Sequence, residues 1–130
     1  MTETVTGACP ATKVRDFGAL EESVRRFRDD RDWRKFHTPK DLAASIAIEA
    51  AELLEHFQWR TDEETRADLA DAAKRDAVAR EMADVLILLL SAADVLGVDL
   101  HAATLAKIEE NARKYPVAKS RGRSTKYDRL

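Results

Sequence analysis

Hydrophobic residues recur every three to four positions along most of the chain, which is the spacing of one face of an α-helix. Two of these series are interrupted, and their apolar members are Leu42, Ile46, Leu53 and Phe57 in the first and Val78, Val85 and Leu88 in the second. The first series skips position 49 and the second skips position 81, and both positions hold glutamate. An acid therefore occupies a core position in each of two predicted helices.

Helix start and stop signals divide the pattern into elements. Thr38-Pro39 combines an N-cap with proline at the first helical position, and Gly97 suits the residue that ends a helix. Thr61 with Glu64 forms a capping box. The first expected helix starts near Asp16, and the second runs from about Pro39 to Phe57. The third is a short polar helix that starts at Thr61. The fourth runs from about Ala73 to Leu96, and the fifth, capped by Asp99, runs from Leu100 to about Lys114.

The fold class that follows is an all-α bundle of four to five helices. The chain has 130 residues, of which 45% are hydrophobic and 35% charged, with only four glycines and three prolines. We expect one helical domain over residues 16–116, a flexible lead over 1–15 and a flexible basic tail over 117–130. The tail is either a solvated terminus or a cationic arm that folds over an anionic ligand.

Charge and cysteine content limit the function classes. The net charge is −2, so no overall field attracts the protein to nucleic acid or to a membrane. The apolar run Val85–Leu90 predicts a buried helix segment that is too short to span a bilayer. Because three or four short helices of one monomer cannot cover it on every side, part of it should face another subunit. A single cysteine, Cys9, fits a reducing compartment, and we expect a cytoplasmic protein.

The two acids that interrupt the apolar series belong to acid-x-x-acid pairs, Glu49 with Glu52 and Glu81 with Asp84. Such a spacing puts both carboxylates on one helical face. One pair alone would be common on a solvated helix. Two pairs that converge at a core edge repel one another and require a cation, so the sequence predicts a divalent-metal site.

The donor set indicates which metal. Four carboxylates with no cysteine and no partnering histidine favour Mg²⁺, with Mn²⁺ possible, over zinc. A di-iron site would need Glu-x-x-His on two helices, but His37, His56 and His101 follow Arg34, Leu53 and Val98 at that spacing. Because Mg²⁺ is usually completed by substrate phosphates, a nucleoside polyphosphate is the expected substrate class.

Aromatic residues flank the helix of the first acid pair. Trp33, Phe36 and His37 precede it and Trp59 follows it. These rings are either core or interface residues or a stacking surface for a nucleotide base. Lys107, Asn111 and Lys114 offer a polar side on the last helix.

These motifs resemble the all-α nucleoside triphosphate pyrophosphohydrolases, the MazG-like superfamily. The closest similarity is to the dCTP pyrophosphatase branch and covers about residues 16–127. It is carried by Arg31-Asp32-Trp33…Phe36-His37-x-Pro39, Glu49-x-x-Glu52-Leu53…Phe57-Gln58-Trp59, Glu81-x-x-Asp84-Val85-Leu86-Ile87, Lys107…Asn111…Tyr115-Pro116 and Ser124-x-Lys126-Tyr127.

The resemblance implies Mg²⁺-dependent hydrolysis of a dNTP, dCTP or 5-modified dCTP above all, to dNMP and pyrophosphate in nucleotide-pool house-cleaning. It implies a homo-oligomer, either a dimer or a dimer of dimers. Val24 and Leu88 stand where close relatives carry histidine and tyrosine. The alternatives are a MazG-like enzyme with a different or broad NTP preference, and a non-catalytic helical nucleotide-binding module.

The site residues follow from the same resemblance. The implied catalytic and metal ligands are Glu49, Glu52, Glu81 and Asp84. The implied substrate-binding residues are Trp33, Arg34, Lys35, Phe36, His37, Trp59, Asn111, Lys114 and Tyr115.

Overall fold

The computed structural model describes residues 16–130, and every regular element in that range is helical. The elements are α1 (Phe17–Asp29), a 3₁₀ turn (Arg34–Phe36), α2 (Pro39–Glu55), α3 (Asp62–Ala70), α4 (Ala72–Leu96), α5 (Leu100–Lys114), α6 (Val117–Ser120) and a second 3₁₀ turn (Tyr127–Arg129). The all-α prediction is confirmed. The predicted lead, residues 1–15, lies outside the described residues.

Local capping chemistry sets the helix ends where the sequence predicted them. Asp16 accepts hydrogen bonds from the backbone N–H groups of Gly18 and Ala19, at 2.8 and 3.3 Å. Thr61 and Glu64 form the reciprocal capping box at the start of α3. Gly97 ends α4 with a φ of 66°, a left-handed conformation that suits a residue without Cβ.

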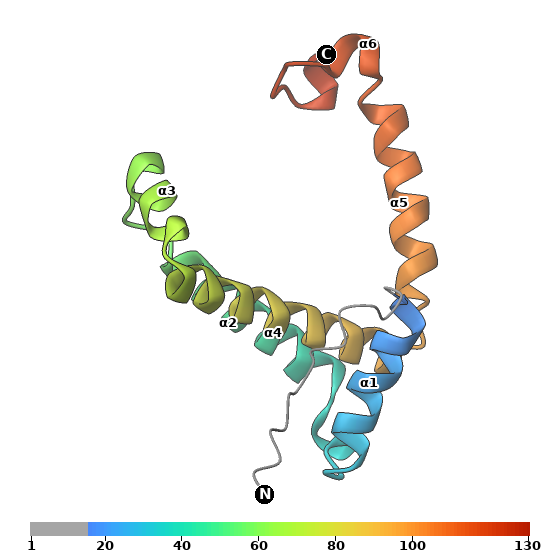
Figure 1. Ribbon diagram of the computed structural model, residues 1–130. Helices are drawn as coiled ribbons and strands as arrows, with labels where there is room; N and C mark the ends of the chain where they lie inside the picture. Colours follow the sequence, from blue (N-terminus) through green and yellow to red (C-terminus); the bar gives the residue numbers. More distant parts are fainter. Residues whose placement is uncertain (1–15) are drawn as a thin grey trace, which may run out of the picture.

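Helices α2 and α4 lie side by side and run in opposite directions, and this pair is the centre of the fold (Figure 1). Its buried apolar residues are Leu42 from α2 and Leu90 and Ala93 from α4. Helix α1 packs against the C-terminal part of α4, and α3 packs against α4 as well. Side chains of α2 therefore face side chains of α4 along the length of the two helices.

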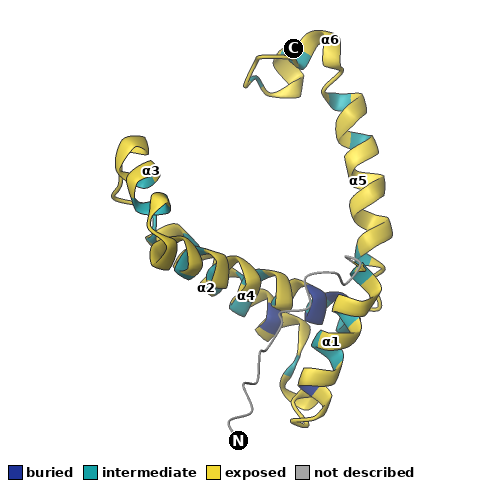
Figure 2. Ribbon diagram, viewed as in Figure 1, coloured by how far each residue is buried: buried dark blue, intermediate teal, exposed yellow. Residues whose placement is uncertain are grey.

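Helix α5 does not return to the α2–α4 pair. It turns away from α4 at an angle of 105° and carries the C-terminal residues away from the rest of the chain (Figure 1). No residue of α5 is buried, and Leu105 and Ile108 are exposed (Figure 2). The five helices expected from the sequence, α1 to α5, are present, and a short sixth, α6, follows. In a single chain α5 has no buried residue, although His101 near its start lies beside Phe17 of α1, with ring centroids 5.5 Å apart.

The apolar segment Val85–Leu90 is only partly covered in the single chain, which agrees with the expectation that one monomer cannot cover it on every side. Leu90 is buried, whereas Leu86, Ile87 and Leu89 are exposed. The physical reason is the direction of α5, which leaves one side of α4 uncovered.

Among residues 16–130 no single helix is long and apolar enough to cross a membrane, and only α4 and α5 taken together pass that test.

The stretch predicted as a basic tail contains two short turns, α6 and the 3₁₀ turn at Tyr127–Arg129. The ring of Tyr127 meets that of Tyr115 edge-on, with centroids 6.0 Å apart. Residues near the C-terminus therefore contact the end of α5. Their flexibility stays a prediction.

Candidate metal and nucleotide site

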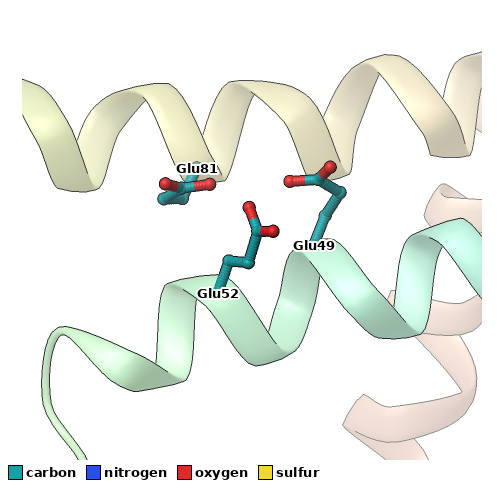
Figure 3. Close-up of side chains that lie close together, drawn as sticks. All are labelled: Glu49, Glu52 and Glu81. Atoms are coloured by element: carbon teal, nitrogen blue, oxygen red, sulfur yellow. The ribbon is translucent and has the colours of Figure 1, made fainter.

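Three of the four predicted acids meet between α2 and α4. Glu49 and Glu52 extend from α2 toward Glu81 on α4, as Figure 3 shows. Each offers a carboxylate oxygen within 4.8 Å of those of the other two. The two residues that interrupt the apolar stripes thus face each other across the helix pair. Three carboxylates this close can all bind one divalent cation.

Glu49 has an environment that is unfavourable for a charged carboxylate. Its Oε2 is buried and has no hydrogen-bond partner. Burial raises the pKa of the Glu49 carboxyl, and the neighbouring Glu52, Asp84 and Glu81 raise it further. A buried anionic oxygen without a donor is costly unless a cation or a proton compensates its charge.

Asp84 lies next to this cluster without joining it. Its charge contributes to the raised pKa of Glu49, but Asp84 is exposed and its carboxylate is not among the three that approach within 4.8 Å. Glu81 and Asp84 share one face of α4, so Asp84 extends the acidic surface by about one helical turn.

The residues fit a hard divalent cation. All the clustered donors are carboxylate oxygens, which Mg²⁺ and Mn²⁺ prefer, and the buried Oε2 of Glu49, which has no hydrogen-bond partner, suits contact with a cation. Three or four carboxylates also leave coordination positions for water and phosphate oxygens. Such a centre can bind the phosphates of a nucleotide and polarise a phosphorus–oxygen bond.

One contact beside the acids was not predicted from the sequence. Nε2 of His56 lies 3.9 Å from Oε1 of Glu81, but His56 is not among the residues whose ligand atoms cluster within 4.8 Å, so the all-carboxylate donor set is unchanged. The sequence test looked for Glu-x-x-His within one helix, whereas this contact joins the end of α2 to α4. His56 does follow Glu52 by four residues, and that spacing on one helical face is the signal that could have indicated it.

The predicted base-binding rings lie at opposite ends of α2. Trp33 precedes the helix and packs edge-on against Phe27 of α1, with centroids 5.8 Å apart. Trp59 follows the helix and is 86% exposed. The 17 residues of α2 span about 25 Å. One base therefore cannot contact both tryptophans of the same chain.

The other predicted residues before α2 differ in environment. Arg34, Lys35 and Phe36 form the exposed 3₁₀ turn, and Lys35 pairs with Asp32 at 2.7 Å. His37 is half-buried, and its Nδ1 has no hydrogen-bond partner. Burial lowers the pKa of His37, and the charge of Arg28 lowers it further, so the ring is neutral at pH 7.

The predicted residues of the last helix are far from the acids of their own chain. Asn111 and Lys114 lie toward the end of α5, followed by Tyr115, on the part of the chain that extends away from α2 and α4 (Figure 1). Lys114 pairs with Glu110 at 2.7 Å, and its ammonium lies 5.3 Å from the Tyr127 ring centroid. The single chain thus does not bring these residues to the acidic cluster.

Known proteins match this chain in sequence and in structure. The model of the MazG-like family matches residues 44–130. The bovine and human proteins named dCTP pyrophosphatase 1 are 41% and 40% identical over 113 residues, which cover 84% of this chain and 67% and 66% of theirs. The aligned region thus spans about two thirds of these relatives.

A solved structure has the same fold. The crystal structure of a pyrophosphatase from Archaeoglobus fulgidus is 45% identical, superimposes with a TM-score of 0.70, and is covered over 99% of its length by 80% of this chain. Together with the family model and the mammalian relatives, it confirms the resemblance predicted from the acid pairs and tryptophan motifs. The chain belongs to the MazG-like family, in its dCTP pyrophosphatase branch.

Proposed function

We propose that this protein hydrolyses a deoxynucleoside triphosphate to the monophosphate and pyrophosphate, with a divalent cation bound at the α2–α4 acidic cluster. The observation that carries the proposal is the approach of Glu49, Glu52 and Glu81 within 4.8 Å, with a buried Glu49 oxygen that lacks a partner. The relatives named dCTP pyrophosphatase and pyrophosphatase support the same reaction.

The cation is Mg²⁺, with Mn²⁺ as a substitute, because every clustered donor is an oxygen. When bound, it supplies charge neutralisation for the phosphates and lowers the pKa of a nearby water. Glu49, Glu52 and Glu81 hold it, and Asp84 adds a fourth carboxylate at the edge. These four acids are the proposed catalytic and metal-binding residues.

The preferred base is cytosine, as in dCTP or a 5-modified dCTP, and the role is removal of unwanted nucleotides from the pool. Stacking surfaces are offered by the rings of Trp33, Phe36, His37 and Trp59. Arg34 and Lys35 stand between Trp33 and Phe36 in the sequence. Half-buried Val24 and Leu88 carry no polar group, so base selectivity depends on the remaining residues.

The active unit is a homo-oligomer, either a dimer or a dimer of dimers. Three features support this assembly: α5 has no buried residue, one side of α4 is apolar and exposed, and the two tryptophans lie at opposite ends of α2 (Figure 2). A second copy can cover the apolar surfaces. It can also bring its own Asn111, Lys114 and Tyr115, or one of its tryptophans, toward the acids of the first.

The substrate is the only partner proposed besides the second copy. Nothing in the net charge of −2 favours nucleic acid or a membrane surface, and the single cysteine fits a cytoplasmic location. The basic stretch 117–130 is either a solvated terminus or a cationic arm that closes over the phosphates.

The test is a screen of all canonical and 5-modified NTPs and dNTPs for Mg²⁺-dependent pyrophosphate release. The expected result is pyrophosphate and dNMP in equal amounts, fastest with dCTP or a 5-modified dCTP, and none without metal. A faster reaction with another base would indicate a different preference within the family. Nucleotide binding without turnover would indicate a non-catalytic binding module and would contradict the proposal.

A further inference from the structure

His56 stands beside the acidic cluster on the same face of α2 as two of the acids. It follows Glu49 by seven residues and Glu52 by four, and its backbone keeps the helical conformation at φ −66° and ψ −20°. Residues at these separations lie above one another on a helix. The His56 imidazole therefore continues the row of carboxylates at the end of α2.

The contact of this imidazole is with Glu81 on the opposite helix. Nε2 of His56 lies 3.9 Å from Oε1 of Glu81, and both side chains are partly buried. The group of carboxylates within 4.8 Å of one another does not include the imidazole, so His56 lies at the edge of the cluster. The Phe57 ring is next to it, tilted by 58° with centroids 6.3 Å apart.

The distance is longer than a hydrogen bond, which requires about 3.2 Å or less between nitrogen and oxygen. Both side chains are partly exposed, at 32% and 24%, and a rotation that shortens the distance by less than 1 Å would make it a hydrogen bond. The Nε2–H group would then donate to Oε1 and leave Oε2 of Glu81 for the cation. Partners of this kind orient carboxylate ligands in metal sites.

We propose that His56 is a positioning residue, which holds the Glu81 carboxylate toward the cluster and thereby strengthens divalent-cation binding. This inference rests on the proposed function, because it takes the cluster to be a cation site. His56 itself does not bind the cation. Its role is to fix one of the three carboxylates that do.

The experiment measures Mn²⁺ binding to the full-length protein by electron paramagnetic resonance, without nucleotide. His56→Asn removes the donor at the Nε2 position, whereas His56→Gln carries an amide N–H that reaches about as far as Nε2. His101→Asn is the matched control, because His101 packs against Phe17 on α1, with centroids 5.5 Å apart. Circular dichroism checks that each variant is folded.

His56→Asn should weaken Mn²⁺ binding by about 10- to 100-fold, whereas His56→Gln and His101→Asn should bind nearly as the wild type does. Unchanged binding by His56→Asn overturns the inference. Equal loss in His56→Asn and His56→Gln overturns it as well, because the donor would then not matter. A direct ¹⁴N coupling from His56 to bound Mn²⁺ would make the imidazole a ligand and also overturn it.

The same titration separates this inference from the function on which it rests. If the wild-type protein binds no Mn²⁺, the cation site fails and the proposed function fails with it. If the wild type binds and His56→Asn binds equally well, only the role of His56 is rejected.

Discussion

Arg28 on α1 donates a hydrogen bond of 2.5 Å from Nη1 to Oδ2 of Asp94 on α4. The Arg28 side chain is only 2% exposed, and its Nε donates to Asp29 at 2.8 Å. Its Nη2 is buried without a partner. The charge of Arg28 is thus compensated by two carboxylates, of which Asp94 alone comes from another helix and joins α1 to α4.

We expect Asp94→Ala to lower the free energy of unfolding by about 3 kcal/mol, because it leaves a buried guanidinium with Asp29 as its remaining partner. Urea denaturation measures the loss. Arg26→Ala is the control on α1, since Arg26 is 72% exposed and lies 3.9 Å from Glu22. It should change stability by about 0.5 kcal/mol or less. Equal effects of the two substitutions would contradict the role of the Arg28–Asp94 pair.

The same pair predicts a pH dependence. Burial alone would raise the pKa of Asp94, but hydrogen bonds and charges from Arg28 and Arg25 outweigh it and hold the pKa below its usual 3.8. The folded state therefore binds the proton more weakly than the unfolded state. Asp94 contributes stability above the unfolded value, and this contribution is lost as the pH falls through the lower folded value.

The stability difference between wild type and Asp94→Asn should be constant from about pH 7 to pH 5 and shrink below about pH 4. Urea denaturation at each pH measures it. A stability difference that grows as the pH falls below about 4 would show that folding raises the pKa of Asp94 and does not lower it.

For the metal site, we expect Glu49→Gln to abolish turnover while the protein stays folded, with a melting temperature equal to or above that of the wild type. The carboxylate is unfavourable in the metal-free protein because burial and the nearby acids raise its pKa, and glutamine keeps its shape. Mg²⁺ should raise the melting temperature of the wild type and not that of the variant.

Glu63→Gln, at an exposed acid of α3, should keep both turnover and the Mg²⁺ effect. Unchanged turnover in Glu49→Gln would remove Glu49 from the site. Unfolding of Glu49→Gln would instead assign this residue a structural role.

The assembly prediction concerns an uncovered stripe of α4 formed by Met82, Leu86 and Leu89, which lie one turn apart and are all exposed. We expect the wild type to be a dimer or tetramer at micromolar concentration by light scattering. Leu86→Glu should shift it toward the monomer, because it places a charge in the apolar contact. Arg80→Ala, an exposed position of α4, should not change the mass. A monomeric wild type would contradict the proposed assembly.

Much of the fold could be predicted because helix ends depend on nearby residues. Asp16, Thr38 and Thr61 cap the helices that follow them, and Gly97 ends α4 with positive φ. The acids at positions 49 and 81 were recognisable because each interrupts an apolar stripe. These signals lie within a few residues along the chain.

What the sequence did not indicate depends on contacts between distant residues. Arg28 lies in a run of charges that resembles a solvated surface, yet its partner Asp94 is 66 positions away. His56 meets Glu81 across two helices. The exposure of Leu86 and Leu89 follows from the direction of α5 after Gly97, and no local pattern specifies that direction.

The bond that is broken tests the central claim most directly. If the acids hold the cation on the phosphates and the rings hold the base, the substrate is fixed at both ends and the α-phosphorus faces the attacking water. The water oxygen then bonds to the α-phosphorus, the bond from that phosphorus to the bridging oxygen breaks, and pyrophosphate leaves.

The measurement is turnover of dCTP with Mg²⁺ in ¹⁸O-labelled water, followed by phosphorus NMR and mass spectrometry of the products. The account predicts one ¹⁸O atom in dCMP and none in pyrophosphate. Label in pyrophosphate would place the attack at the β-phosphorus, and orthophosphate as the first product would place it at the γ-phosphorus. Either result would contradict the account.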